Sequence, residues 1–175
     1  MHDRMRAGLN EQVNHELQAF YTYLSMSSWF EAENLPGFAS WMRAQADEEK
    51  EHAERIIRHM HDRNARVELD ALERPPGDFD EPVEVMRAAL EHEQEVTSQI
   101  HELVDLAEEV HDPAAESMLE WFVDEQVEEE RTFTVLIGQL ERAGDSGAGL
   151  MLMDDRLGQR GGGGDGGEGD GGEEA

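Results

Sequence analysis

The chain has 175 residues, 42 acidic and 14 basic side chains, a net charge of −28 and no cysteine. Its length allows one domain with a substantial core. The charge argues against nucleic acid and anionic membranes as partners, because both attract positive charge. Without cysteine there are no disulfides, cysteine-bound zinc sites or iron–sulfur clusters. Any bound metal must therefore be held by carboxylate, imidazole or amide ligands.

The composition also bears on location and habitat. The sequence contains no run of 18 apolar residues, and residues 1–6 lead into an amphipathic helix. We therefore expect a cytoplasmic protein with no membrane partner. Lys50 is the only lysine among the 14 basic residues. Such acidity favours a protein from a halophile, because at 1 M salt the Debye length of about 3 Å screens dense like charge.

Helical periodicity extends over nearly the whole chain, and the alternation typical of strands is absent. We predict an all-α fold with four long helices at about residues 4–33, 37–64, 81–110 and 113–142. The breaker at residues 34–37 is so short that the first two helices must be antiparallel neighbours. Asp112 is the expected N-cap of the fourth helix, with Pro113 at its first position.

The link between the second and third helices is the main topological signal. Residues 65–80 include Pro75, Pro76 and Gly77 and cannot form one helix. Sixteen extended residues reach about 53 Å, whereas a helix of about 28 residues is about 42 Å long. We predict a long crossover that makes the second and third helices parallel, with a slack antiparallel loop as the alternative.

Two short segments follow the bundle. Residues 150–157 can form a fifth helix, whose apolar face we expect to meet another subunit because a completed bundle has no room for it. We assign residues 1–158 to one domain. Residues 159–175 are mostly Gly, Asp and Glu, which cannot form a core, and we predict a disordered acidic tail there.

Each long helix carries a stripe of apolar residues at steps of three and four. In the third helix the predicted stripe is Met86, Leu90, Glu93, Thr97, Ile100, Val104 and Ala107. In all four helices polar residues interrupt the apolar stripe near the middle of the helix. They are Glu16 in the first helix, Glu49 and His52 in the second, Glu93 in the third, and Gln126 and Glu129 in the fourth. Buried unpaired carboxylates are costly, so we infer bound cations. Carboxylates with one imidazole suit a redox-capable metal such as iron, and two ions bridged by Glu49 would use all six residues.

An internal repeat supports a shared metal centre. Residues 47–52 and 124–129 are similar and lie 77 positions apart, and the same offset relates Glu16 to Glu93. A pseudo-twofold bundle would bring both halves to one depth. The alternative is a metal-free bundle in which these polar residues pair with one another. We expect the other histidines, including His15, His59, His61, His92, His101 and His111, at the surface or in satisfied packing positions.

Four motifs carry a family resemblance: residues 10–17, the Glu48-Glu49-x-x-His52 run, Glu93-Gln94, and the specific string at residues 121–130. With them the chain resembles the non-haem ferritins of bacteria and archaea over about residues 5–158. The resemblance implies a ferritin-like four-helix bundle with one long crossover. It also implies a 24-subunit cage whose fifth helices line channels at the fourfold axes.

The resemblance further implies a set of ligands. One iron would be held by Glu16, Glu49, His52 and Gln126, and the second by Glu49, Glu93 and Glu129. A third site would fall on Glu48, Glu125, Glu128 and Glu129. Tyr23 matches a family tyrosine, which we expect to hydrogen-bond a ligand or to supply an electron, and Trp121 matches a family tryptophan nearby.

The subtype depends on one difference from relatives. Di-iron oxidases and bacterioferritins repeat Glu-x-x-His in the last helix, whereas this chain has Gln126-x-x-Glu129. The missing imidazole favours iron that passes through the site into storage, and Lys50 at the position of the haem-ligating methionine argues against haem. The resemblance thus implies a ferroxidase that oxidises Fe(II) with O2 or H2O2 and stores ferric mineral. A soluble di-iron oxidase or peroxide scavenger without storage is the alternative.

Overall fold

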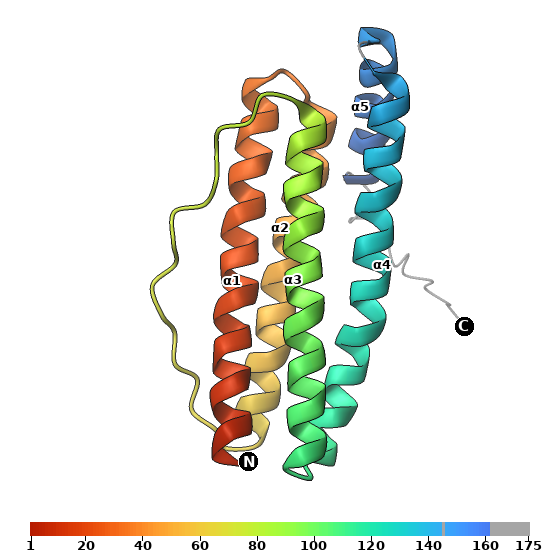
Figure 1. The fold of residues 1–175 in the computed structure, drawn as a ribbon. Helices are drawn as coiled ribbons and strands as arrows, with labels where there is room; N and C mark the ends of the chain where they lie inside the picture. The colour runs from red at the N-terminus through yellow and green to blue at the C-terminus, as the bar shows by residue number, and fades with distance from the viewer. Residues whose placement is uncertain (145, 162–175) are drawn as a thin grey trace, which may run out of the picture.

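The computed structural model describes residues 1–144 and 146–161, which form five helices and no strand (Figure 1). The helices are α1 (Asp3–Ala32), α2 (Pro36–Asp62), α3 (Pro82–Glu109), α4 (Pro113–Ala143) and α5 (Gly147–Gly161). The all-α bundle is confirmed, and each long helix begins and ends close to its predicted limits. Helix α5 runs three residues past the predicted domain limit at residue 158. The rest of the predicted tail, residues 162–175, lies outside the described residues. None of the described helices has both the length and the apolarity needed to cross a membrane.

The four long helices end sharply, each at a residue with positive φ. These residues are Asn34 (59°), Asn64 (56°), His111 (55°) and Gly144 (50°). After the first of them, Leu35 donates a backbone hydrogen bond to the carbonyl of Phe30 (3.0 Å), and equivalent bonds follow Asn64 and His111. Such left-handed ends satisfy the last helical carbonyls and reverse the chain. At Asn34 the reversal makes α1 and α2 an antiparallel hairpin, and at His111 it does the same for α3 and α4.

The crossover between α2 and α3 runs along the outside of α1 (Figure 1). Three amide side chains spaced four residues apart on α1 hold it: Asn10, Asn14 and Gln18. Asn14 donates to the carbonyl of Glu68 (3.1 Å) and accepts from the N–H of Asp70 (2.8 Å). Gln18 likewise pairs with both backbone groups of Glu73 (3.2 and 2.7 Å). These amides supply the hydrogen-bond partners that the backbone of an extended segment would otherwise lack. The predicted long crossover is confirmed.

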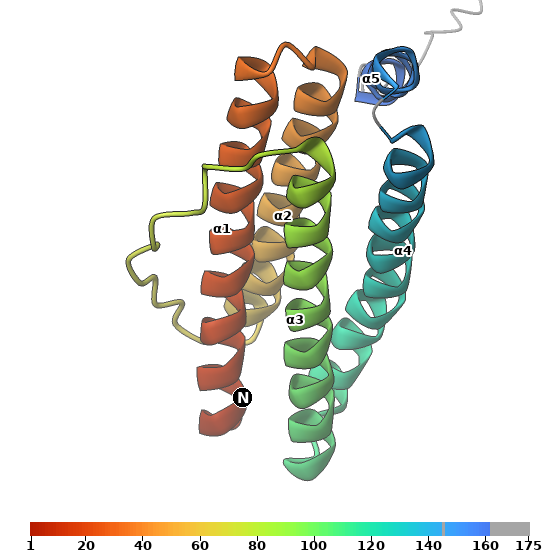
Figure 2. The ribbon, with the colours of Figure 1, turned by 45° about the horizontal axis from the view of Figure 1, so that its top comes forward.

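Helix α5 lies across the end of its own bundle, against the start of α2 (Figure 2). Asp154 and Leu157 are buried there, and Asp154 Oδ1 accepts a hydrogen bond from the backbone N–H of Phe38 (2.9 Å). Helix α2 has no side-chain cap of its own, so Asp154 supplies one. We expected the apolar face of this helix to meet another subunit. That expectation is wrong for the face that carries Asp154 and Leu157, because this face packs against the bundle of its own chain. On the other face Met151 and Leu152 are exposed.

The apolar core is divided into two clusters. One surrounds Phe30, Phe38 and Phe133, and the other surrounds Leu9 and Ile56. On α3 the predicted stripe is correct at Met86, Glu93, Ile100 and Ala107, but Leu90, Thr97 and Val104 are only half-buried. Their places in the core are taken by Ala89, Val96 and Leu103. Both flanks of α3 offer apolar residues, and its contacts with α1 and α4 decide which flank is buried.

Candidate metal centre

A polar layer separates the two apolar clusters. It contains all six residues that the sequence predicts at the middle of the helices, and every one is buried. They are Glu16 of α1, Glu49 and His52 of α2, Glu93 of α3, and Gln126 and Glu129 of α4, each at most 5% exposed. The heptad-like stripes above and below this layer keep these side chains inside, because one helical face carries both the apolar residues and the ligands.

Glu16, Glu49 and His52 form a ready-made group of ligands, with one atom from each within 4.8 Å of the others. His52 Nδ1 lies 3.3 Å from Glu49 Oε2 and 3.9 Å from Glu16 Oε2. Glu16 Oε1 accepts a hydrogen bond from Gln12 (2.8 Å), but Glu16 Oε2 is buried without a hydrogen-bond partner. A buried carboxylate oxygen without a partner is costly, and a cation between these three side chains would remove that cost.

On the other side of the layer, Glu93 is held by two donors. The hydroxyl of Tyr23 donates to Glu93 Oε1, and Gln126 Nε2 donates to Glu93 Oε2 (3.0 Å) and to its backbone carbonyl (3.1 Å). Gln45 donates to Glu129 Oε1 (3.4 Å). The family resemblance assigns Gln126 to the first ion, whereas the structure places its amide against Glu93. Rotation of that amide would offer its oxygen to a cation beside Glu93 and Glu129.

Three carboxyl groups of this layer, those of Glu16, Glu49 and Glu129, have raised pKa values. Burial raises the pKa of Glu16 well above its ordinary value, and the charge of Glu49 raises it further. Burial also raises the pKa of Glu49 well above normal, with Glu93 adding to the effect. Burial and the charge of Glu93 raise the pKa of Glu129 to about 8. Burial and like charge thus favour the protonated forms of these three carboxyl groups, and a divalent ion would replace the protons.

A second group of ligands adjoins the first. Glu48, His52 and Glu125 have atoms within 4.8 Å of one another, and both carboxylates are half-buried. The predicted third site contains Glu48 and Glu125, but the structure joins them to His52 and leaves Glu128 exposed, outside the group. Burial raises the pKa of Glu48. The shared imidazole makes a continuous path of ligands from the buried layer to the side of the bundle formed by α2 and α4.

Aromatic rings hold His52 in place. Trp121 meets the imidazole edge-on, with 5.3 Å between ring centroids, and Phe122 does so at 5.7 Å. The guanidinium of Arg55 lies 4.0 Å from the centre of the Trp121 ring, at cation–π distance. The family resemblance places Trp121 near the centre but implies no role for Arg55. The only signal for Arg55 is its position three residues after His52, on the next turn of the same helix.

Two glutamines near the centre have a role that the sequence did not reveal, although Gln45 falls on the inward stripe predicted for the second helix. Gln12 hydrogen-bonds Glu16, and Gln45 hydrogen-bonds both Glu129 and Glu48. Each glutamine lies four residues before a predicted ligand, Glu16 or Glu49, and therefore on the same helical face. That spacing could have identified Gln12 as the partner of Glu16, whereas the bond from Gln45 to Glu129 joins α2 to α4 and depends on the packing of the two helices.

A four-helix bundle with inward carboxylates and a Glu-x-x-His pair at one level is the architecture of the carboxylate-rich metal-binding bundles. A family profile described as a ferritin-like domain matches residues 6–143. The bacterial non-heme ferritin of Staphylococcus aureus (strain USA300) is 40% identical over 152 residues, which are 87% of this chain and 92% of that protein. The bacterial non-heme ferritin of Bacteroides fragilis (strain 638R) is 37% identical, over 90% of this chain and 98% of its own length.

Solved structures give the same result. The open pore ferritin of the hyperthermophilic archaeon Archaeoglobus fulgidus superposes with a TM-score of 0.89 at 39% sequence identity. The match covers 90% of this chain and 98% of that one. The chain therefore belongs to the ferritin family.

Proposed function

We propose that this protein stores iron and that each subunit oxidises Fe(II) at the buried polar layer. The observation that carries the proposal is the convergence of four buried carboxylates and one imidazole from four helices, with Glu16 Oε2 left without a partner. Only cations can balance that many carboxylates when they are ionised. Oxygen ligands with a single imidazole suit Fe(II), and the named relatives are ferritins.

In this proposal two Fe(II) ions are the substrates. Glu16, Glu49 and His52 would bind the first ion, and Glu93 and Glu129 the second, with Glu49 as the bridge. The Gln126 amide would turn toward the second ion. Two Fe(II) ions together release two electrons, which reduce O2 and two protons to H2O2, or H2O2 and two protons to water. The ligands supply position and charge, while the metal supplies the electrons.

The path of ligands beside the centre supports a storage role. Glu48 and Glu125 share His52 with the first group of ligands and would receive Fe(III) as it leaves the layer. We propose that subunits assemble into a 24-subunit cage and that this path opens into its cavity. The support is the fold shared with other ferritins over nearly the whole chain. Met151 and Leu152, exposed on α5, would lie at contacts between subunits.

The test is addition of Fe(II) in air to the purified protein, followed by measurement of oxidation rate, particle mass and retained iron. We expect rapid oxidation, a cage-sized particle and far more iron than two ions per subunit. Oxidation with only two irons retained by a small oligomer would instead indicate a soluble di-iron oxidase or peroxide scavenger. Failure of the wild-type protein to oxidise Fe(II) would overturn the proposal.

Variants distinguish Fe(II) oxidation at the buried layer from an effect of the acidic surface of the protein. Glu49→Ala and His52→Ala should each lose most of the oxidation rate, because they remove the bridge and the imidazole. Glu51→Ala and His61→Ala are the matched controls, since both side chains are exposed on α2. Equal rates in all four variants would contradict a role for the buried layer.

The cytoplasmic location and the high-salt habitat stay predictions from the sequence. Thermal unfolding measured from low to molar salt tests the second of them. We expect the melting temperature to rise with salt, because screening weakens the repulsion within a chain of net charge −28.

A further inference from the structure

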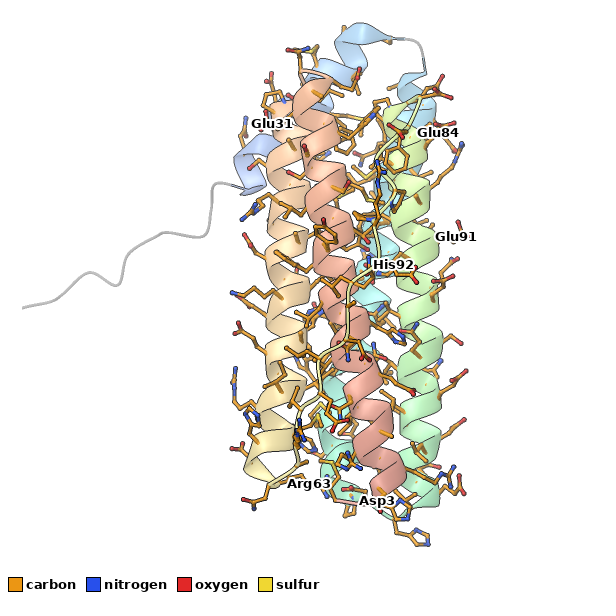
Figure 3. All side chains as sticks on the ribbon, turned by 90° about the vertical axis from the view of Figure 1, so that its left-hand side faces the viewer. Asp3, Glu31, Arg63, Glu84, Glu91 and His92 are labelled. Atoms are coloured by element: carbon orange, nitrogen blue, oxygen red, sulfur yellow. The ribbon has the colours of Figure 1, made fainter. Side chains whose placement is uncertain are left out.

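A groove of about 450 Å³ lies between α1 and α3. Its polar lining includes His15, Gln18 and Thr22 of α1, and His92, Glu95 and Gln99 of α3. Helix α1 contacts α2 and α3, and α3 contacts α4, so this face is opposite the α2 and α4 side of the bundle. Figure 3 looks toward this face and shows His92 between α1 and α3. The groove therefore approaches the buried layer from the side opposite to Glu48 and Glu125.

The groove has the same internal symmetry as the metal centre. An offset of 77 positions relates His15 to His92, Gln18 to Glu95, and Thr22 to Gln99. The same offset relates Glu16 to Glu93, the ligands expected for the two ions. The same internal repeat therefore supplies residues to both the groove and the buried layer.

Unpartnered atoms link the groove to metal binding. Among the described residues, three buried side-chain atoms have no hydrogen-bond partner: Glu16 Oε2, His92 Nε2 and Gln99 Oε1. The first belongs to the metal centre, and the other two residues line this groove. An imidazole nitrogen and an amide oxygen are both ligand types for first-row divalent metals. Both atoms are closed to solvent in this structure, so small rotations of the two side chains would turn them toward a hydrated cation in the groove and give each a partner.

The groove also lies next to the buried layer. The ring of His92 meets the ring of Tyr23 edge-on, with 5.8 Å between centroids, and Tyr23 hydrogen-bonds Glu93. One aromatic side chain therefore stands between the groove and a predicted ligand of the second ion.

We propose that this groove is a separate metal-binding site, at which a hydrated divalent cation waits before it enters the buried layer. The inference rests on the proposed function, in which that cation is Fe(II). Among the described residues, only the two groups around His52 have three His or acidic ligand atoms within 4.8 Å of one another. A cation in the groove would therefore keep much of its water and exchange quickly. Glu91 and Glu95 supply the negative charge that attracts it.

The binding test uses Co(II) alone, which is located by anomalous diffraction from crystals of the assembled protein. We expect one Co(II) position in the groove, besides those in the buried layer. The double variant His15→Gln, Gln99→Leu should lose the groove position and keep the others. His92 is left unchanged because its ring contacts Tyr23. Absence of Co(II) from the groove of the wild-type protein would overturn the proposal.

The kinetic test compares Fe(II) oxidation by the same double variant and the wild type. At limiting Fe(II) we expect the initial rate to fall by about threefold or more, because the groove no longer concentrates the cation. At saturating Fe(II) the rate should be close to that of the wild type, so that KM rises while kcat changes little. Replacement of the unpartnered Gln99 amide by Leu should not lower the melting temperature.

His101→Gln is the matched control, since His101 is exposed on α3 and does not line the groove. It should leave both rates unchanged. If the wild type oxidises Fe(II) but the double variant matches it at limiting iron, the groove has no part in delivery and only this inference fails. If the wild type oxidises no Fe(II), the proposed function fails, and groove-bound Co(II) would then show a metal site without that role.

Discussion

The hydroxyl of Tyr23 on α1 donates a hydrogen bond to Glu93 on α3, seventy positions later in the chain. Both side chains are almost completely buried. Burial raises the pKa of Tyr23 well above normal, with the charge of Glu93 adding to the effect, so the hydroxyl keeps its proton and remains a donor. The bond joins the two helical hairpins at the level of the proposed ions and holds one oxygen of Glu93 in a defined direction.

Tyr23→Phe should slow Fe(II) oxidation and lower stability. The variant leaves Glu93 Oε1 without its donor, and the loss of a buried hydrogen bond to a carboxylate costs about 1–3 kcal/mol. We expect the number of bound ions to stay the same, because every ligand remains. Stopped-flow oxidation and thermal unfolding measure the two effects, with Tyr21→Phe, at an exposed tyrosine, as the control. Unchanged rate and stability would show that the bond is dispensable.

Stability of the metal-free protein should fall as pH rises from about 5 to about 8. Burial, with the charge of Glu93, raises the pKa of Glu129 from 4.5 to about 8 in the folded chain. Between these values the folded state holds a proton that the unfolded state has lost, so a higher pH favours unfolding. Urea unfolding at several pH values measures the trend.

Glu129→Gln isolates the contribution of that carboxyl group. The neutral amide cannot titrate, so the variant should lose less stability than the wild type between pH 5 and pH 8. A divalent ion should remove most of the dependence, because it takes the place of the protons. Parallel curves for the wild type and the variant would contradict the raised pKa.

Asn14→Ala should loosen the crossover from α1. The amide satisfies the carbonyl of Glu68 and the N–H of Asp70, and its removal should cost about 1–3 kcal/mol. We expect faster proteolysis of residues 66–74 under native conditions as well as a lower urea midpoint. Glu11→Ala, at an exposed site on the same helix, is the control. Equal proteolysis of both variants would mean that the other two amides suffice.

Gly37→Ala should displace α5 from the bundle. A Cβ at this position would lie 1.8 Å from the backbone oxygen of Asp154, which no rotation of a side chain can relieve. The hydrogen bond from Phe38 to Asp154 would break with it, so we expect faster amide hydrogen exchange in α5 and a lower melting temperature. Gly147→Ala, with no atom within 4 Å of its added Cβ, is the control. Normal exchange in α5 of Gly37→Ala would contradict this docking.

Much of the candidate site could be predicted because its signals are local. Glu49 and His52 are three residues apart on one helical face, and the apolar residues around them show which face is inside. The 77-residue offset then matched the second half to the first without any knowledge of contacts. The same reasoning could not place Gln126, because the rotamer of an amide depends on its neighbours. In the structure those neighbours are Glu93 and Thr97, on another helix.

The sequence by itself determined the helices, their limits, the crossover and the depth of the polar layer, because periodicity and breakers act over a few residues. Only the tertiary structure decided how separate helices meet. It buried one flank of α3 rather than the other, joined Asp154 to Phe38, and shared His52 between two groups of ligands. It also left the Nε2 atom of His92 without a hydrogen-bond partner. Each of these depends on the packing of segments far apart in the chain, where several arrangements satisfy the same local pattern and only one fills the space.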